Sequence, residues 1–171
     1  DPAFTKSQSW LIGEDVFTPG VAGDALRSMA NPGKAHPRDD QPAHMSQYQN
    51  LPVDRKSDNG GVHINSGIPN KAAYEAGVKI GGEKLAKIWY KALTDHMTAK
   101  ANFSEAAKAT ITAANELYAG DASVSQAVKD AWAAVGVDPN KPTNVQTIPD
   151  EFLEEALSAG HSHGGFVPPA V

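Results

Sequence analysis

The sequence contains no cysteine, no excess of basic residues and no long hydrophobic run. Without cysteine the chain forms no disulfide and offers no thiolate to a metal, although this leaves the cellular compartment undecided. The net charge of -5, with no basic cluster, argues against nucleic acid and anionic membranes as partners. No apolar run approaches the length of a transmembrane helix or a signal peptide, so we expect no targeting or anchoring element within these residues.

The 171 residues, 40% of them hydrophobic, suffice for one sizeable core with an appendage. Apolar side chains recur at helical spacing and predict helices at residues 66–77, 85–93, 102–118 and 123–135. Two pairs are typical of capping boxes, Asn102 with Glu105 and Ser123 with Gln126. Gly77 is expected to end the first of these helices. We therefore expect a mainly α, helical bundle-like domain with little sheet.

The residues before these helices have the composition of a loop region. Residues 10–17 predict a short extended segment in which Trp10, Ile12 and Phe17 face inward. Asp24 is expected to cap a single helical turn. Residues 30–57 contain several prolines and no sustained period, and they predict a long ordered loop. Loops of this length inside compact domains are usually functional or mobile.

One stretch, residues 58–66 (DNGGVHINS), combines a turn signal with side chains suited to proton chemistry. Its Asn-Gly-Gly run accepts positive φ and predicts a tight turn. Val62, His63 and Ile64 then alternate, which predicts an extended segment with the imidazole pointing outward. Asp58 can fold back across the turn to accept a hydrogen bond from His63 and fix its tautomer. From spacing alone, such a pair is more often a structural hydrogen bond than a catalytic couple.

Three strings of this sequence resemble the C-terminal domain of the thermolysin-like zinc metallopeptidases. They are IGEDVFTPGVAGDALRSMANPG (12–33), QPAHMSQY (41–48) and DNGGVHINSGIPNKAAY (58–74). The second string is similar to the protealysin-like branch of that family. The similarity runs from about Trp10 to Val137, with the strings in the family's order. The resemblance implies the α-helical fold of that C-terminal domain.

The resemblance also implies roles for four residues. His63 matches the histidine that donates a hydrogen bond to the oxyanion of the tetrahedral intermediate, and Asp58 matches the aspartate that orients it. Arg27 matches the arginine that binds the substrate carbonyl just beyond the scissile bond, and Leu26 lines the neighbouring pocket. Without the resemblance, Arg27 would be interpreted as a surface ion-pair residue.

The zinc ligands implied by the resemblance lie outside this sequence. The family binds zinc through the histidines of HExxH and a later glutamate, all upstream of the matched region, and no HExxH occurs here. We therefore interpret the chain as half an active site and predict that it is inactive as a peptidase on its own. In many members of the family, acidic residues around the string that contains Glu14 and Asp15 help to bind a pair of calcium ions. Ser9 and Leu11 stand here in place of two of those carboxylates, which argues against the paired site. The resemblance also implies the second calcium site of some family members, near Thr18 and Asp24.

The partners implied by the resemblance are an N-terminal catalytic domain carrying HExxH and a protein or peptide substrate. Secretion is inferred because most members of the family are exported. The chain is thus interpreted as the substrate-side half of a zinc-dependent neutral endopeptidase. The alternative is a non-catalytic module of the same fold that binds a peptide or a protein.

The C-terminal residues are not explained by the resemblance. We expect a domain at residues 1–137, followed at residues 138–171 by a linker, a short helix near Ile148 to Leu157 and a flexible tail. The tail carries His161 and His163 among glycines, and such ends are usually weak, adventitious metal binders at most.

Overall fold

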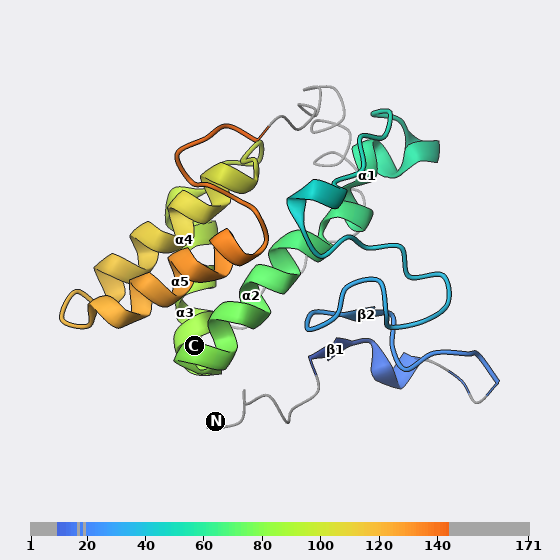
Figure 1. Cartoon of the computed structure of the whole chain (residues 1–171), viewed down its shortest axis with the longest axis horizontal. Coiled ribbons are helices and arrows are strands. Elements are labelled where there is room, and N and C mark those ends of the chain that lie inside the picture. The colour runs from blue at the N-terminus through green and yellow to red at the C-terminus, as the bar shows by residue number, and fades with distance from the viewer. Residues whose placement is uncertain (1–9, 17, 19, 144–171) are drawn as a thin grey trace, which may run out of the picture.

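The computed structural model describes residues 10–16, 18 and 20–143, and the longer elements all follow residue 57 (Figure 1). The helices are α1 (Asp58–Asn65), α2 (Gly67–Ile80), α3 (Gly82–Lys91), α4 (Phe103–Leu117) and α5 (Ala122–Ala134), with a π-helical turn at Ala92–His96. The strands β1 (Leu11–Ile12) and β2 (Arg27–Ser28) and three short 3-10 turns, at Glu14–Val16, Met45–Gln47 and Arg55–Ser57, precede or border them. The expectation of a mainly α domain with little sheet is confirmed.

Helix α2 lies at the centre of the molecule. It packs against α5 and α3, while α4 packs against both α3 and α5. In Figure 1, α2 runs between the pair α4–α5 on one side and the loop region with β1 and β2 on the other. In the described ranges, no helix is long and apolar enough to span a bilayer.

The core forms where the apolar faces of these helices meet. Trp132 of α5 is 1% exposed and stacks on Trp89 of α3, with ring centroids 6.5 Å apart and planes inclined by 4°. Its indole Nε1 donates to Thr110 Oγ1 at 2.8 Å, so the polar end of the ring keeps a partner in the core. Each large aliphatic side chain buried around it contributes about 1.5–3 kcal/mol. These include Ile68, Ile88, Val124 and Val128.

The helix ends follow the predicted signals in part. Asn102 and Glu105 form the reciprocal capping box that was predicted for α4. The prediction for α5 was wrong by two residues, because Asp121 accepts from the N–H of Ser123 and caps the helix. Gly77 does not end α2. It lies buried within the helix, where an added Cβ would stand 2.5 Å from Trp10 Cη2, and the helix continues to Ile80.

The short strands before residue 30 pair in antiparallel register, Leu11 with Ser28 and Ile12 with Arg27. Trp10 is buried as predicted and meets Tyr74 of α2 edge to face, with centroids 5.2 Å apart. The expectation that Ile12 faces inward was wrong, since it is 42% exposed. Asp24 caps no helical turn, because the chain runs through bends into β2. Phe17 lies outside the described residues.

Residues 30–57 form the predicted loop, and two of its polar side chains, Asp39 and Gln41, are buried. At the other end of the described chain, the segment 138–143 folds back on the start of α4, where Ser104 Oγ donates to the carbonyl of Lys141. The predicted domain boundary after residue 137 stays a prediction. The short helix expected near residues 148–157, and His161 and His163, lie outside the described residues.

Candidate functional site

The stretch 58–66 begins with a left-handed turn. Asp58, Asn59, Gly60 and Gly61 have φ of 56°, 48°, 84° and 77°, and they precede a short right-handed helical segment that ends at Asn65. The expectation of an extended segment around His63 was therefore wrong. Glycine, asparagine and aspartate are the residue types that tolerate this conformation best, and all four positions of the turn hold one of these three types. The alternation of three residues carried too little information to decide between strand and helix.

The left-handed turn places the carboxylate of Asp58 over the start of the helical segment. Its Oδ2 accepts hydrogen bonds from the backbone N–H groups of His63, at 2.8 Å, and Ile64, at 3.0 Å. Its Oδ1 lies 2.5 Å from His63 Nδ1. The predicted contact between Asp58 and His63 is thus confirmed, and the carboxylate also satisfies backbone donors that would otherwise be orphaned at a helix start.

These contacts change the acidity of Asp58. Burial raises the pKa of its carboxyl, but the hydrogen bond from His63 and those from the two backbone N–H groups outweigh burial, so the pKa lies below its usual value. Asp58 is therefore an anion at neutral pH. A carboxylate at Nδ1 favours the tautomer that carries its proton on that nitrogen and stabilises the imidazolium.

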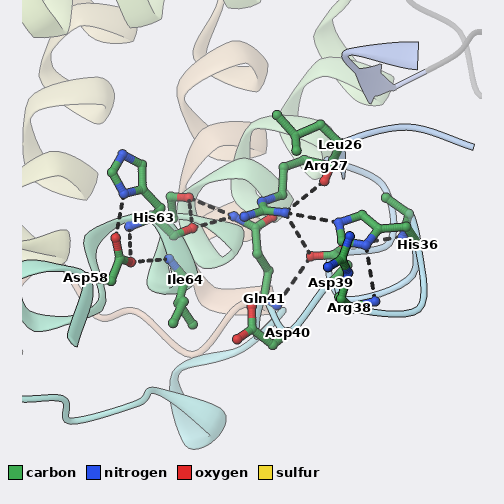
Figure 2. Close-up of polar contacts among 12 residues, drawn as sticks. Leu26, Arg27, His36, Arg38, Asp39, Asp40, Gln41, Asp58, His63 and Ile64 are labelled. Carbon is green, nitrogen blue, oxygen red and sulfur yellow. Dashed lines mark hydrogen bonds and ion pairs between the residues drawn. The ribbon is translucent and has the colours of Figure 1, made fainter. Parts of the chain in front are cut away.

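The imidazole of His63 projects from the surface, with 81% of its side chain exposed (Figure 2). Because Nδ1 is held by Asp58, Nε2 is the ring nitrogen that can meet a ligand. In the neutral ring Nε2 accepts a hydrogen bond, and in the imidazolium it donates one. The arrangement can therefore stabilise negative charge that develops beside Nε2.

Gly61 allows the turn to pack against the helical segment. An added Cβ there would lie 2.8 Å from Asn65 Nδ2, in a backbone conformation that L side chains rarely adopt. Asn65 cannot retreat easily, because its side chain exchanges two hydrogen bonds of 2.9 Å with the backbone of Gln49. The side-chain amide thus fastens the turn to the long loop.

Arg27 and Leu26 lie at and just before β2. Arg27 Nη1 donates to the carbonyl of Leu26 at 2.8 Å, and it lies 3.8 Å from Asp39 Oδ1 and 3.4 Å from His36 Nε2. The side chain of Arg27 is 23% exposed, and Leu26 is 46% exposed. Both residues thus reach the surface beside the loop that also contacts His63.

The long loop joins the two groups through Gln41. Its Nε2 donates to the carbonyl of His63 at 2.7 Å and to Ser66 Oγ at 2.8 Å, while its own N–H donates to Asp39 Oδ1 at 3.4 Å (Figure 2). Sequence reasoning missed Asp39, Gln41 and Asn65. The string that begins at Gln41 was noted as a family feature, but nothing in its pattern indicated a buried amide beneath the histidine.

The left-handed turn lines a pocket of about 310 Å³. Gly60 and Gly61 form one wall of it, and Tyr48 and Phe103, edge to face with centroids 6.1 Å apart, form another. Burial raises the pKa of Tyr48, which keeps its hydroxyl protonated at neutral pH. The pocket therefore offers aromatic surface and a neutral hydroxyl.

The residues predicted for metals show no assembled site. Across residues 10–16, 18 and 20–143 there is no group of three or more histidine, aspartate or glutamate side chains that could hold a metal ion. Thr18 and Asp24 are both exposed; the Thr18 carbonyl accepts from Val21 N–H, and Asp24 N–H donates to the Ala35 carbonyl. Calcium binding near them stays a prediction.

Comparison of the sequence with known proteins shows the family to which the chain belongs. Residues 2–137 match the family model described as the thermolysin metallopeptidase, alpha-helical domain. The chain belongs to this thermolysin family. An extracellular elastase of Staphylococcus epidermidis is 48% identical over 134 residues, which cover 78% of this chain and 24% of that protein. A zinc metalloproteinase of Listeria monocytogenes is 45% identical over 135 residues, covering 79% of this chain and 25% of that protein.

A solved structure of the thermolysin family gives the same result for the fold. The precursor of protealysin, a metalloproteinase from Serratia proteamaculans, is 43% identical to the chain, which it matches with a TM-score of 0.67 over 77% of this chain and 42% of its own. The resemblance to the C-terminal domain of thermolysin-like peptidases is thereby confirmed. The chain spans about a quarter of the length of the two curated relatives.

Proposed function

We propose that this chain is the substrate-side part of a zinc-dependent endopeptidase, in which His63 stabilises the oxyanion of the tetrahedral intermediate. The observation that carries the proposal is the geometry of one imidazole. Its Nδ1 lies against an anionic carboxylate that is itself fixed by two backbone N–H groups, and its other face is exposed. This arrangement presents a prepositioned, chargeable donor at Nε2.

The chemistry needs such a donor because peptide hydrolysis passes through a tetrahedral intermediate that carries negative charge on the former carbonyl oxygen. A donor aimed at the place where this charge develops lowers the barrier without any cost of reorganisation. Asp58 supports His63 in two ways: it fixes the ring, and its negative charge stabilises the imidazolium. Removal of His63 should therefore affect turnover more than substrate binding.

In the proposal, Arg27 and Leu26 bind the substrate. The contacts with Asp39 and Leu26 use Nη1 of Arg27, and the guanidinium has further N–H donors at Nη2 and Nε. These donors suit a substrate carbonyl beyond the scissile bond. Leu26, 46% exposed beside them, suits an apolar side chain of the substrate. Both contacts exist in the ground state, so they contribute to substrate affinity.

Zinc is the metal that the proposal requires. Catalytic zinc takes about three protein ligands, and no described group of three suitable side chains exists. We propose that zinc is held by an N-terminal catalytic domain that carries HExxH. The name of the Listeria relative supports zinc, and that of the Staphylococcus relative supports action outside the cell.

A non-catalytic module is the weaker proposal. A module that only binds a partner has no need for an arginine and a histidine joined through buried side chains of one loop, yet Asp39 and Gln41 form that connection here. Sequencing upstream of Asp1 separates the two. An HExxH motif with a downstream glutamate supports the endopeptidase, and an unrelated domain supports the module.

The experiment is steady-state kinetics of the full-length, zinc-loaded protein with His63→Ala. The change should lower kcat by about 10²- to 10³-fold, the usual cost of one oxyanion donor, and leave KM nearly unchanged. His96→Ala is the control, because His96 pairs with Glu116 of α4 and makes no contact with His63 or Asp58 in the described residues. An unchanged kcat for His63→Ala would mean that the histidine only closes the turn with Asp58.

A further inference from the structure

Asp39 is a buried carboxylate in the middle of the long loop. Its side chain is 0% exposed. Two backbone N–H groups of its own loop donate to it, Ala35 to Oδ2 at 3.1 Å and Gln41 to Oδ1 at 3.4 Å. These bonds satisfy part of its acceptor capacity but supply no positive charge.

A buried anion needs a cation, because an ionised carboxylate removed from water is costly unless it is paired. Arg27 supplies the cation, with Nη1 3.8 Å from Asp39 Oδ1. The guanidinium is still 23% exposed, so it is anchored on one side and accessible on the other. The pair therefore joins the loop interior to the surface where substrate is proposed to bind.

His36 is a less suitable anchor for Arg27, although its Nε2 lies 3.4 Å from Nη1. The backbone N–H of Arg38 donates to His36 Nδ1 at 3.1 Å, which makes Nδ1 an acceptor. A neutral imidazole with an acceptor at Nδ1 carries its proton on Nε2. Nε2 and the guanidinium are then both donors, so His36 does not hold Arg27. Nη1 is held by the carbonyl of Leu26, at 2.8 Å, and Asp39 is the anion that pairs with it.

The loop around Asp39 is packed tightly enough to act as a fixed support. Gly67 of α2 lies directly against it, where an added Cβ would stand 2.5 Å from the carbonyl of Pro42 and 2.8 Å from Gln41 Cβ. Gln41 in turn holds the carbonyl of His63. A shift of Asp39 is therefore opposed by α2 and by the His63 segment together.

We propose that Asp39 is the positioning residue for Arg27, holding its Nη1 so that the remaining guanidinium donors face the substrate carbonyl. This inference rests on the proposed function of Arg27. Asp39 lies in the interior and reaches substrate only through Arg27. Its loss should therefore change the same kinetic parameter that the loss of Arg27 changes, and by less.

The test is a double-mutant cycle in the full-length, zinc-loaded protein, with a peptide substrate and separate values of kcat and KM. Arg27→Ala should raise KM about ten- to a hundredfold, the usual worth of a hydrogen bond to a charged donor. Asp39→Asn should raise KM by at most about tenfold, the lower end of that range, because the guanidinium is still present but is held less firmly. In the Arg27→Ala background, Asp39→Asn should have no further effect on KM. Asp40→Asn is the matched control, since Asp40 is the next residue in the chain and its side chain is exposed.

The outcomes separate the two proposals. If Arg27→Ala leaves KM and kcat unchanged, the proposed role of Arg27 fails. If Arg27→Ala acts as expected but Asp39→Asn does not, only the role of Asp39 fails. An equal effect of Asp39→Asn in both backgrounds also overturns it, because the carboxylate would then act on the loop in general.

A second measurement needs no variant and covers the case in which Asp39→Asn does not fold. Guanidinium nitrogen resonances of the unaltered protein report rotation about the arginine side-chain bonds. Arg27 should show hindered rotation with resolved Nη signals, whereas the exposed Arg38 of the same loop should show averaged signals. Averaged signals for Arg27 would contradict a fixed guanidinium and overturn the inference.

Discussion

The helical part, residues 67–137, and the loop part, residues 20–66, are held together by different forces. Apolar faces meet in the helical part, where Trp132 of α5 stacks on Trp89 of α3 and donates a hydrogen bond to Thr110 of α4. In the loop part single polar side chains connect distant segments: Asn65 holds Gln49, and Gln41 holds His63. The helical part thus supplies stability, and the loop part fixes the direction of the candidate site residues.

The first prediction tests the helical side of this comparison and has the largest expected effect. Trp132→Ala removes the largest fully buried side chain and should lower the free energy of unfolding by about 3–5 kcal/mol. Denaturant unfolding of the purified chain measures it. Tyr90→Ala, an aromatic residue that is 70% exposed, is the control and should change stability little. Equal losses for the two variants would contradict a core centred on Trp132.

The second prediction tests the left-handed turn. Gly61→Ala places a Cβ 2.8 Å from Asn65 Nδ2 at a φ of +77°, and the left-handed conformation alone costs about 1–2 kcal/mol for an alanine. We expect lower stability and also lower kcat of the full-length protein, because the turn aims His63. Gly120→Ala is the matched control, since its Cβ would meet no atom within 4 Å. Full activity of Gly61→Ala would show that the turn does not set the imidazole.

The third prediction concerns acid. The pKa of Asp58 is lowered in the folded chain from an ordinary value of 3.8, so its contribution to stability is complete above about pH 4 and is lost as the pH falls through the lowered pKa. The free energies of unfolding of the unaltered chain and of Asp58→Asn should therefore differ at pH 6, and the difference should shrink as the pH falls below 3.8. If the difference between the two free energies of unfolding stays constant as the pH falls, titration of Asp58 does not contribute to the loss of stability in acid.

The smallest effect is expected for the ion pairs on the outer face of the helical part. Lys87 and Glu83 lie 2.6 Å apart one turn from each other on α3, and both side chains are more than half exposed. Solvent-exposed pairs of this kind contribute little. Lys87→Ala should leave the thermal unfolding of the chain without measurable change, and a clear loss would show that surface charge helps to order the helical part.

Sequence patterns predicted the helical part better than the loop part, for a physical reason. Helical periodicity and the capping pair Asn102–Glu105 are local signals, and they placed α3 and α4 correctly. Gly77 misled because its role is a close approach to Trp10, which no local pattern records. In the site, Asp58 and His63 were found together because they are neighbours across one turn.

Asp39, Gln41 and Asn65 could not be found in the same way. Each acts through a contact with a residue 12 or more positions away, and such contacts depend on the folded path of an irregular loop. Even the conformation around His63 was set by the left-handed turn before it. The family resemblance supplied the candidate residues, but the side chains that hold them in place could be identified only from the structure.

The most direct test of the central claim compares two inhibitors of the full-length, zinc-loaded protein. One is a peptide phosphonate, whose tetrahedral oxyanion imitates the intermediate, and the other is the matching amine-side product peptide, which has no anionic oxygen at the cleaved bond. His63→Ala should weaken phosphonate binding by about 10²- to 10³-fold and leave product binding unchanged. Equal changes in the two inhibition constants, or none, would contradict a role for His63 at the oxyanion.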